Sequence, residues 1–154
     1  MPSRLRFPSL STAALIACQA SAAPGTYELF NAGAHDLPIM VSRIIRGEGT
    51  TLHSARLHLL PDGRLDGEIV VSFTDSGTVT DTIVAHGGWR ADGDSIRLTY
   101  QWSQPRWQGG PRVFVPGQPV SGAVKGSEFT IPEFAYFNDE FFGSSAPLRF
   151  HRVP

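Results

Sequence analysis

The sequence predicts an all-β fold: an antiparallel barrel of about eight to ten strands, with a two-sheet β-sandwich as the alternative. The chain of 154 residues contains 16 Gly and 12 Pro, and only 18% of its residues are charged. Such a composition is typical of short strands joined by tight turns. Turn-forming Asp-Gly and neighbouring Gly residues recur at short intervals from Gly25 onward, and apolar residues alternate with polar ones between them.

The alternation places the expected strands in order along the chain. They lie near residues 26–31, 37–46, 51–60, 64–74, 78–90, 95–102, 112–115, 120–124, 128–131 and 147–152. In each, every second side chain should face a shared apolar core, while the others face water. The side chains expected on the buried faces include Ala55, Leu57, Leu59, Leu65, Ile69, Val71, Phe73, Val79, Ile83, Ala85, Trp89, Ile96, Leu98, Tyr100 and Trp102.

The period of the pattern fits both a barrel and a sandwich. Closing sequential hairpins into a barrel removes the exposed edges, which favours the barrel. In that arrangement the first strand should lie beside the last, with Tyr27–Leu29 next to Leu148–Phe150.

The first 24 residues are typical of an export signal and a short linker, followed by a single domain over residues 25–154. Arg4 and Arg6 precede an uncharged run that is too short to span a bilayer. Residues 20–22 (ASA) form a small-x-small cleavage site, whereas residues 15–18 (LIAC) form a lipobox. The lipobox reading explains the lone Cys18, because a lipidated thiol needs no disulfide partner. We expect an exported protein, either a lipoprotein of the bacterial envelope or a free periplasmic or extracellular protein.

The charge distribution argues against a nucleic-acid partner. The formal net charge is −1, and the sequence contains no clustered basic stripe of the kind that binds phosphate backbones. Membrane association is therefore expected only through the lipid anchor.

Several short motifs carry a resemblance to a known family. Residues 25–29 read GTYEL, residues 36–38 read DLP, residues 54–59 read SARLHL before Asp62-Gly63, and residues 87–89 read GGW before a second Asp-Gly turn. This pattern resembles that of small secreted bacterial lipocalin-like proteins, which are calycin-type β-barrels. The resemblance implies a barrel, and it implies that Arg149 or Arg152 covers Tyr27. Lipocalins proper have a Trp at the first-strand position, but here Trp89 lies in the middle of the chain.

The segment of residues 132–143 is rich in aromatic and acidic side chains and breaks the alternation. It could form a wall or lid over an apolar ligand, an exposed contact patch for a partner, or a plug that seals one barrel end. For a ligand inside the barrel, the expected binding residues are Tyr100, Trp102, Phe134, Tyr136 and Phe137.

A protein partner would instead use aromatic loops at one end of the barrel. The expected contact residues are Trp107, Phe141 and Phe142. Arg106 and Arg112 lie near enough in the pattern to pair with the carboxylates of residues 139 and 140, if the two loops meet at the same end.

No catalytic motif stands out, and we expect no catalytic residue, cofactor or metal ion. The chain has no nucleophile elbow and no glycine-rich phosphate loop. His53 and His58 are five residues apart, so in a regular strand they should face opposite sides, which does not favour a shared metal.

The function that the sequence favours is a non-catalytic binding protein that holds a small apolar or amphipathic ligand in the barrel. The alternative is an interaction or inhibitor module of the envelope that uses the aromatic loops. An enzyme with an unrecognised site, assembled from distant residues, is the third hypothesis.

Overall fold

The computed structural model describes residues 22–41, 49–74, 77–104, 110–135, 137–138 and 147–154, and in these ranges the chain forms strands and no helix. The all-β prediction is therefore confirmed. The strands are β1 (Gly25–Ala32), β2 (His35–Asp36), β3 (Ile39–Val41), β4 (Gly49–Leu59), β5 (Arg64–Thr74), β6 (Thr78–Asp92), β7 (Ser95–Ser103), β8 (Phe114–Pro116), β9 (Val120–Lys125), β10 (Glu128–Ile131), β11 (Glu133–Phe134), β12 (Phe137–Asn138) and β13 (Leu148–Val153).

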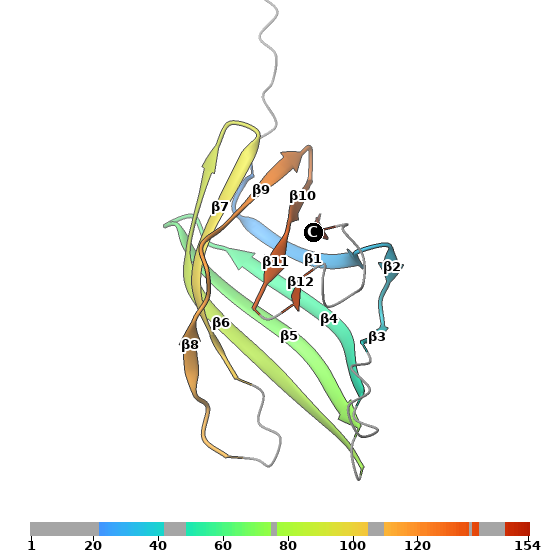
Figure 1. Ribbon diagram of the computed structural model, residues 1–154. Coiled ribbons are helices and arrows are strands. Elements are labelled where there is room, and N and C mark those ends of the chain that lie inside the picture. Colours follow the sequence, from blue (N-terminus) through green and yellow to red (C-terminus); the bar gives the residue numbers. More distant parts are fainter. Residues whose placement is uncertain (1–21, 42–48, 75–76, 105–109, 136, 139–146) are drawn as a thin grey trace, which may run out of the picture.

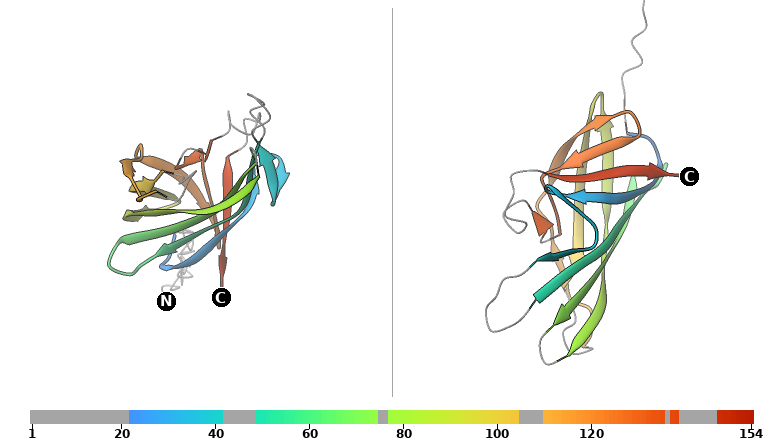
Figure 2. Two further views of the ribbon diagram at one scale, coloured as in Figure 1. Left: turned by 90° about the horizontal axis from the view of Figure 1, so that it is seen from below. Right: turned by 90° about the vertical axis from the view of Figure 1, so that its right-hand side faces the viewer.

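Eight of these strands close into an antiparallel ring in the order β1-β13-β10-β9-β7-β6-β5-β4. The ring is completed by β1 and β4, whose pairing runs from Gly25 opposite Leu59 to Glu28 opposite Arg56. Figures 1 and 2 show the strands curving round a common centre. Closure makes the fold a barrel and excludes the two-sheet sandwich, since a sandwich leaves its sheets separate.

The first strand pairs with the last, as the sequence predicts. Leu29 lies opposite Phe150, and Ala32 lies opposite Leu148. Both ends of the described chain thus lie at one end of the barrel, where Thr26 pairs with Val153.

The inward side chains form one apolar core. The expected inward residues Leu65, Phe73 and Leu98 are all buried, and Phe129 and Phe150 stack with ring centroids 5.1 Å apart. Burying a large aliphatic or aromatic side chain stabilises a fold by about 1.5–3 kcal/mol. The alternation therefore identifies most of the core. The exceptions are Val79, which is 46% exposed near the start of the long β6, and Trp89 and Trp102, which are only partly buried against the core.

Bulges alter the alternation in two strands. In β4 the pairing with β5 shifts between Leu52 and Ser54, so His53 is an extra residue in its strand. His53 and His58 consequently both lie outside the inward set of β4, which corrects the expectation that they face opposite sides. A second shift, between Leu29 and Asn31, lies in β1. A bulge residue reverses the side of the sheet to which all later side chains of the strand point. The sequence pattern does not reveal where such a bulge lies.

An arginine does contact an aromatic ring near the barrel seam, but not the expected ring. The guanidinium carbon of Arg149 lies 4.9 Å from the ring centroid of Phe30. Arg152 donates a hydrogen bond to the carbonyl of Pro24 at 2.7 Å, while the Tyr27 ring turns inward and packs on Phe129 at 4.9 Å. The expected covering of Tyr27 by an arginine is therefore not found among the described residues.

Where β7 ends, the edge of β6 is closed by side chains. Ser103 Oγ accepts a hydrogen bond from the backbone N–H of Val84 at 2.9 Å, and Arg112 donates to the carbonyl of Thr82 at 2.6 Å. Arg112 also donates to Ser103 Oγ at 3.1 Å. Arg112 thus satisfies backbone groups of an open strand edge. The carboxylates with which we expected it to pair, at residues 139 and 140, lie outside the described residues.

Element boundaries follow the prediction closely in most strands and poorly between β1 and β4. The observed β5 and β10 have the predicted limits. The segment predicted as one strand over residues 37–46 contains only the short β3 among its described residues, and β2 lies just before that segment. The β11–β12 hairpin was not predicted as strand. In the described part of the chain there is also no helix of the length and apolarity needed to cross a bilayer.

Candidate functional site

The aromatic side chains singled out in the sequence meet inside the barrel. Tyr100, on β7, and Phe134, on β11, lie with ring centroids 4.6 Å apart. Tyr100 is 8% exposed, and Phe134 and Phe137 are each 1% exposed. Trp102 lies one inward position beyond Tyr100 and is half-buried. The structure therefore brings Tyr100, Phe134 and Phe137 into the core, with Trp102 at its margin.

The Tyr100 hydroxyl is the polar group of this cluster. It accepts a hydrogen bond from the backbone N–H of Ala135 at 3.0 Å. Burial raises the pKa of Tyr100 to about 12, although the Ala135 N–H acts in the opposite direction. At neutral pH the hydroxyl is uncharged and keeps a proton that it can donate.

Two glycines make room for these rings. A Cβ at Gly67, on β5, would lie 3.2 Å from Phe134 Cζ and 2.9 Å from a methyl carbon of Leu57. A Cβ at Gly117 would lie 2.4 Å from the Tyr100 ring. The rings of Phe134 and Tyr100 thus lie directly against backbone, at positions where any side chain would displace them.

The hairpin that carries Phe134 is a separate two-stranded sheet. Phe134 pairs with Phe137 across β11 and β12, which share no strand pairing with the ring. Its turn includes Ala135, whose φ of 56° lies in the left-handed region that is unfavourable for a residue with a Cβ. Among the three interpretations of residues 132–143, the described part has the position of a plug, because the buried Phe134 ring lies against β5 at Gly67.

Several predicted site residues lie outside the described residues. These are Cys18, Trp107, Tyr136, Phe141 and Phe142. Their predicted roles in lipidation, ligand contact and partner contact remain predictions.

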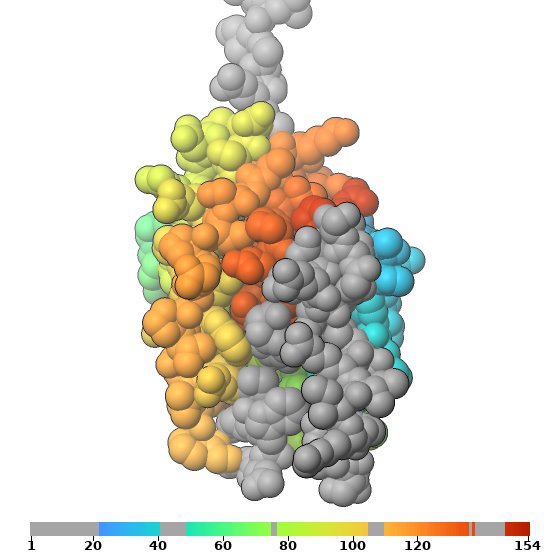
Figure 3. Space-filling view, viewed as in Figure 1, coloured from blue at the N-terminus to red at the C-terminus, as the bar shows by residue number. Residues whose placement is uncertain are grey.

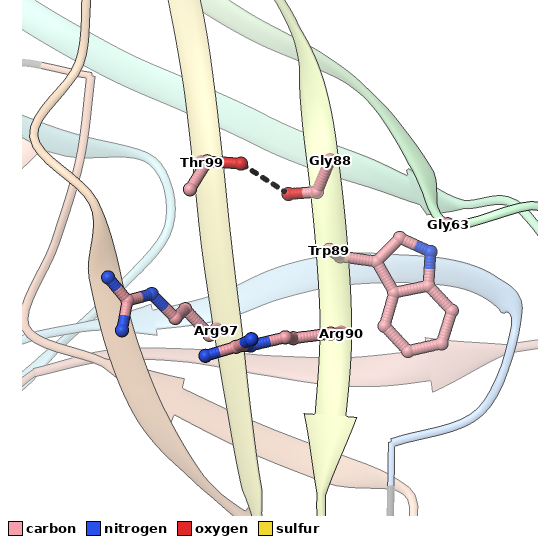
Figure 4. Close-up of a pocket in the computed structure, with 6 residues that line it drawn as sticks. All are labelled: Gly63, Gly88, Trp89, Arg90, Arg97 and Thr99. Atoms are coloured by element: carbon pink, nitrogen blue, oxygen red, sulfur yellow. Dashed lines mark hydrogen bonds between the residues drawn. The ribbon is translucent and has the colours of Figure 1, made fainter.

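A second candidate site, which sequence reasoning missed, lies on the outside of the β6–β7 hairpin. It is a shallow pocket of about 390 Å³ lined by Gly63, Gly88, Trp89, Arg90, Arg97 and Thr99 (Figure 4). Arg90 and Arg97 lie directly opposite each other across the two strands. The signal was the pair of arginines flanking the Asp-Gly turn, but only the strand register shows that they face each other.

A third pocket, of about 290 Å³, lies on the outer face of β1, β4 and β5. Its one basic side chain is already engaged, because Arg56 forms an ion pair with Glu28 and lies opposite Glu68 in the sheet. We therefore do not treat this pocket as a candidate functional site.

The histidines form isolated contacts. His86 Nδ1 lies 2.8 Å from Asp66 Oδ1, and His58 Nδ1 lies 3.1 Å from the hydroxyl of Thr26. Among the described residues, no three His, Cys, Asp or Glu side chains come together in a group that could hold a metal ion.

Comparison of the chain with protein-family models, with curated proteins and with solved structures finds no match, so its assignment as an all-antiparallel eight-stranded barrel, compatible with a lipocalin-like calycin fold, rests on the observed strand pairing.

Proposed function

We propose that this protein is a non-catalytic binding protein that takes up a small apolar or amphipathic molecule inside the barrel. The observation that carries the proposal is the β11–β12 hairpin, an aromatic insert that fills the interior without belonging to the ring of strands. The ligand displaces this hairpin and fills the space of the buried Phe134 and Phe137 rings. It therefore needs an apolar surface like that of the two rings.

The contacts of the hairpin also define the ligand. The wall around Phe134 is apolar and includes Leu57 and Ala85. Tyr100 supplies one hydroxyl, which is now bonded to Ala135 and becomes available when the hairpin leaves. A molecule with an apolar body and one hydrogen-bonding group fits this site best, with Trp102 at its outer margin.

The same proposal includes the cellular setting expected from the sequence. The protein is exported, it carries a lipid on Cys18, and it is a member of the small secreted lipocalin-like proteins. Support comes from the lipobox, from the closed barrel, and from the pairing of the first strand with the last.

The test compares two opposite changes at Ala135, with binding of the fluorescent apolar probe N-phenyl-1-naphthylamine as the readout. Ala135→Gly removes a left-handed strain of roughly 1 kcal/mol, which stabilises the hairpin in place and should weaken probe binding about five-fold. Ala135→Val adds strain to the hairpin turn and should strengthen probe binding.

The control is Gly126→Val, which adds comparable strain in the β9–β10 turn, where φ is 62° and no atom lies within 4 Å of the added Cβ. It should leave probe affinity unchanged. Native mass spectrometry of the purified protein should also show a retained apolar molecule. Equal affinities in both Ala135 variants, or no probe binding by any variant, would overturn the proposal.

A partner-binding function is the second candidate, and one observation favours it. Val113, beside β8, and Phe114, on β8, are 52% and 38% exposed. Figure 3 shows orange-coloured residues from this part of the chain at the molecular surface. Pull-down from envelope extract, with the Val113→Ser/Phe114→Ser double variant as control, tests this function. Capture of one defined protein that the double variant fails to capture would support it, and equal capture by both proteins would count against it.

A further inference from the structure

The β6–β7 hairpin places two positive charges face to face. Arg90 and Arg97 are direct cross-strand partners, and like charges in this position repel each other. Figure 4 shows both side chains extending to the same side of the hairpin, while the Trp89 ring points the other way, toward Gly63. Within the described ranges, neither arginine side chain forms an ion pair or hydrogen bond.

No described carboxylate near Arg90 and Arg97 forms an ion pair with either side chain. Arg64 is engaged elsewhere: its Nε donates to Asp62 Oδ2 at 2.7 Å, which holds the pKa of that carboxyl below its usual value. Asp92, the last residue of β6, and Asp94, in the hairpin turn, lower the local potential, but neither forms an ion pair with the arginines.

The rest of the pocket is built to receive a polar group. The Thr99 hydroxyl contacts the Gly88 carbonyl at 3.4 Å, which is long for an O–H···O bond, so it can turn toward a better acceptor. Gly88 leaves the floor open, since a Cβ there would lie 3.4 Å from the Gly63 carbonyl oxygen. Trp89 fixes one wall: its backbone N–H donates to Gly63 and its indole N–H to Leu60, at 2.8 and 2.9 Å.

We propose that this pocket binds a phosphate group, held between the guanidinium groups of Arg90 and Arg97 with the Thr99 hydroxyl as a third donor. Planar guanidinium groups bind phosphate oxygens in pairs, and a doubly charged anion removes the repulsion between the two arginines. This proposal is independent of a ligand inside the barrel.

The position of the pocket allows two sources for the phosphate. Gly25, where β1 begins, pairs with Leu59, which directly precedes the β4–β5 turn that lines the pocket. The pocket therefore lies at the barrel end where β1 begins, a few residues after Cys18 in the sequence. A lipid there would bring headgroup phosphates close, while a free phosphate compound could reach the same site from solution.

The experiment follows the ¹⁵N side-chain signals of the arginines by NMR while inorganic phosphate is added to the purified protein. We expect a saturable shift of the Arg90 and Arg97 signals. Arg97→Gln should weaken phosphate binding at least about ten-fold, because it removes one of two charged donors. Gly88→Ala should weaken it as well, since the methyl group occupies the floor.

The matched control is Arg149→Gln, which removes an arginine that is already paired with Glu128. It should leave phosphate binding unchanged. The thermal midpoint of Arg97→Gln in phosphate-free buffer should equal or exceed that of the unchanged protein, which shows that the fold is intact. A second arm measures sedimentation with vesicles of phosphatidylglycerol or of phosphatidylcholine.

Binding to phosphatidylglycerol vesicles that Arg97→Gln abolishes identifies a lipid headgroup as the source. Binding of inorganic phosphate without vesicle binding identifies a soluble phosphate compound. The proposal is overturned if neither binds, or if Arg97→Gln and Arg149→Gln bind phosphate equally well.

Discussion

At the scale of single residues, Tyr100 combines burial with one hydrogen bond, and both can be measured. Tyr100→Phe leaves the Ala135 N–H without its acceptor, so we expect the free energy of unfolding at neutral pH to fall by about 1–2 kcal/mol. Chemical denaturation with urea provides the measurement. A loss above about 4 kcal/mol would mean that the ring itself had been displaced.

The raised pKa of Tyr100 also predicts how stability depends on pH. The unfolded chain loses this proton near pH 10, as a free tyrosine does, whereas the folded protein keeps it to about 12. The contribution is complete below pH 10 and declines as pH rises through this window, by up to about 2 kcal/mol after allowance for solvent screening. Denaturation curves between pH 9 and about 12 should show a shallower decline for Tyr100→Phe; identical slopes would contradict the assignment.

The arginine pair makes a residue-scale prediction that needs no ligand. Arg97→Gln relieves repulsion from Arg90, so the thermal midpoint should rise slightly in low-salt, phosphate-free buffer. The gain should disappear at about 1 M NaCl, where exposed charges are screened over about 3 Å. A midpoint that falls at low salt would show that Arg97 has a structural partner.

Single residues also show where sequence reasoning stops. It selected Tyr100 and Phe134, because their rings stood out in position and number, and these two rings do meet. It missed Arg90 and Arg97, because two charges near a turn are ordinary in a sequence. They become a candidate site only when the register sets them opposite each other.

At the scale of elements, the open edge of β6 is the feature most sensitive to substitution. Arg112→Ala removes the donor to the Thr82 carbonyl and leaves Ser103 without that contact. We expect a loss of about 1–3 kcal/mol in the free energy of unfolding, together with slow aggregation through the bared edge. Denaturant unfolding and light scattering measure the two effects. Arg149→Ala, which changes an exposed arginine elsewhere, should cause neither.

Alternation predicts strands well where one face is buried along the whole strand. The limits of β5 were predicted correctly for this reason, with Leu65, Ile69 and Phe73 all inside. It fails at His53, where the bulge inserts a residue, and at β11–β12, whose two-residue strands are too short to show a period. The side of His53 and the existence of the hairpin depend on tertiary contacts that the sequence pattern does not contain.

At the scale of the whole molecule, closure makes the two ends of the described chain neighbours. Thr26 and Val153 are paired residues, so a short linker can join the chain ends while the ring stays intact. A circular permutant opened in the exposed β9–β10 turn, between Gly126 and Ser127, should keep its β-sheet circular dichroism and lose at most about 2 kcal/mol. One opened inside β5, between Ile69 and Val70, should not fold. Equal behaviour of the two would contradict the ring.

The two neighbours of β1 in the ring also bear on how the chain would fold after the proposed export. One flank is β4, which follows soon in the chain, but the other is β13, which follows far later. If the chain leaves a translocation channel N-terminus first, β1 can pair with β4 early. It lacks its other partner, β13, until nearly all of the chain has emerged. The ring can therefore close only after β13 is available, which is compatible with the proposed export of the chain in an unfolded state.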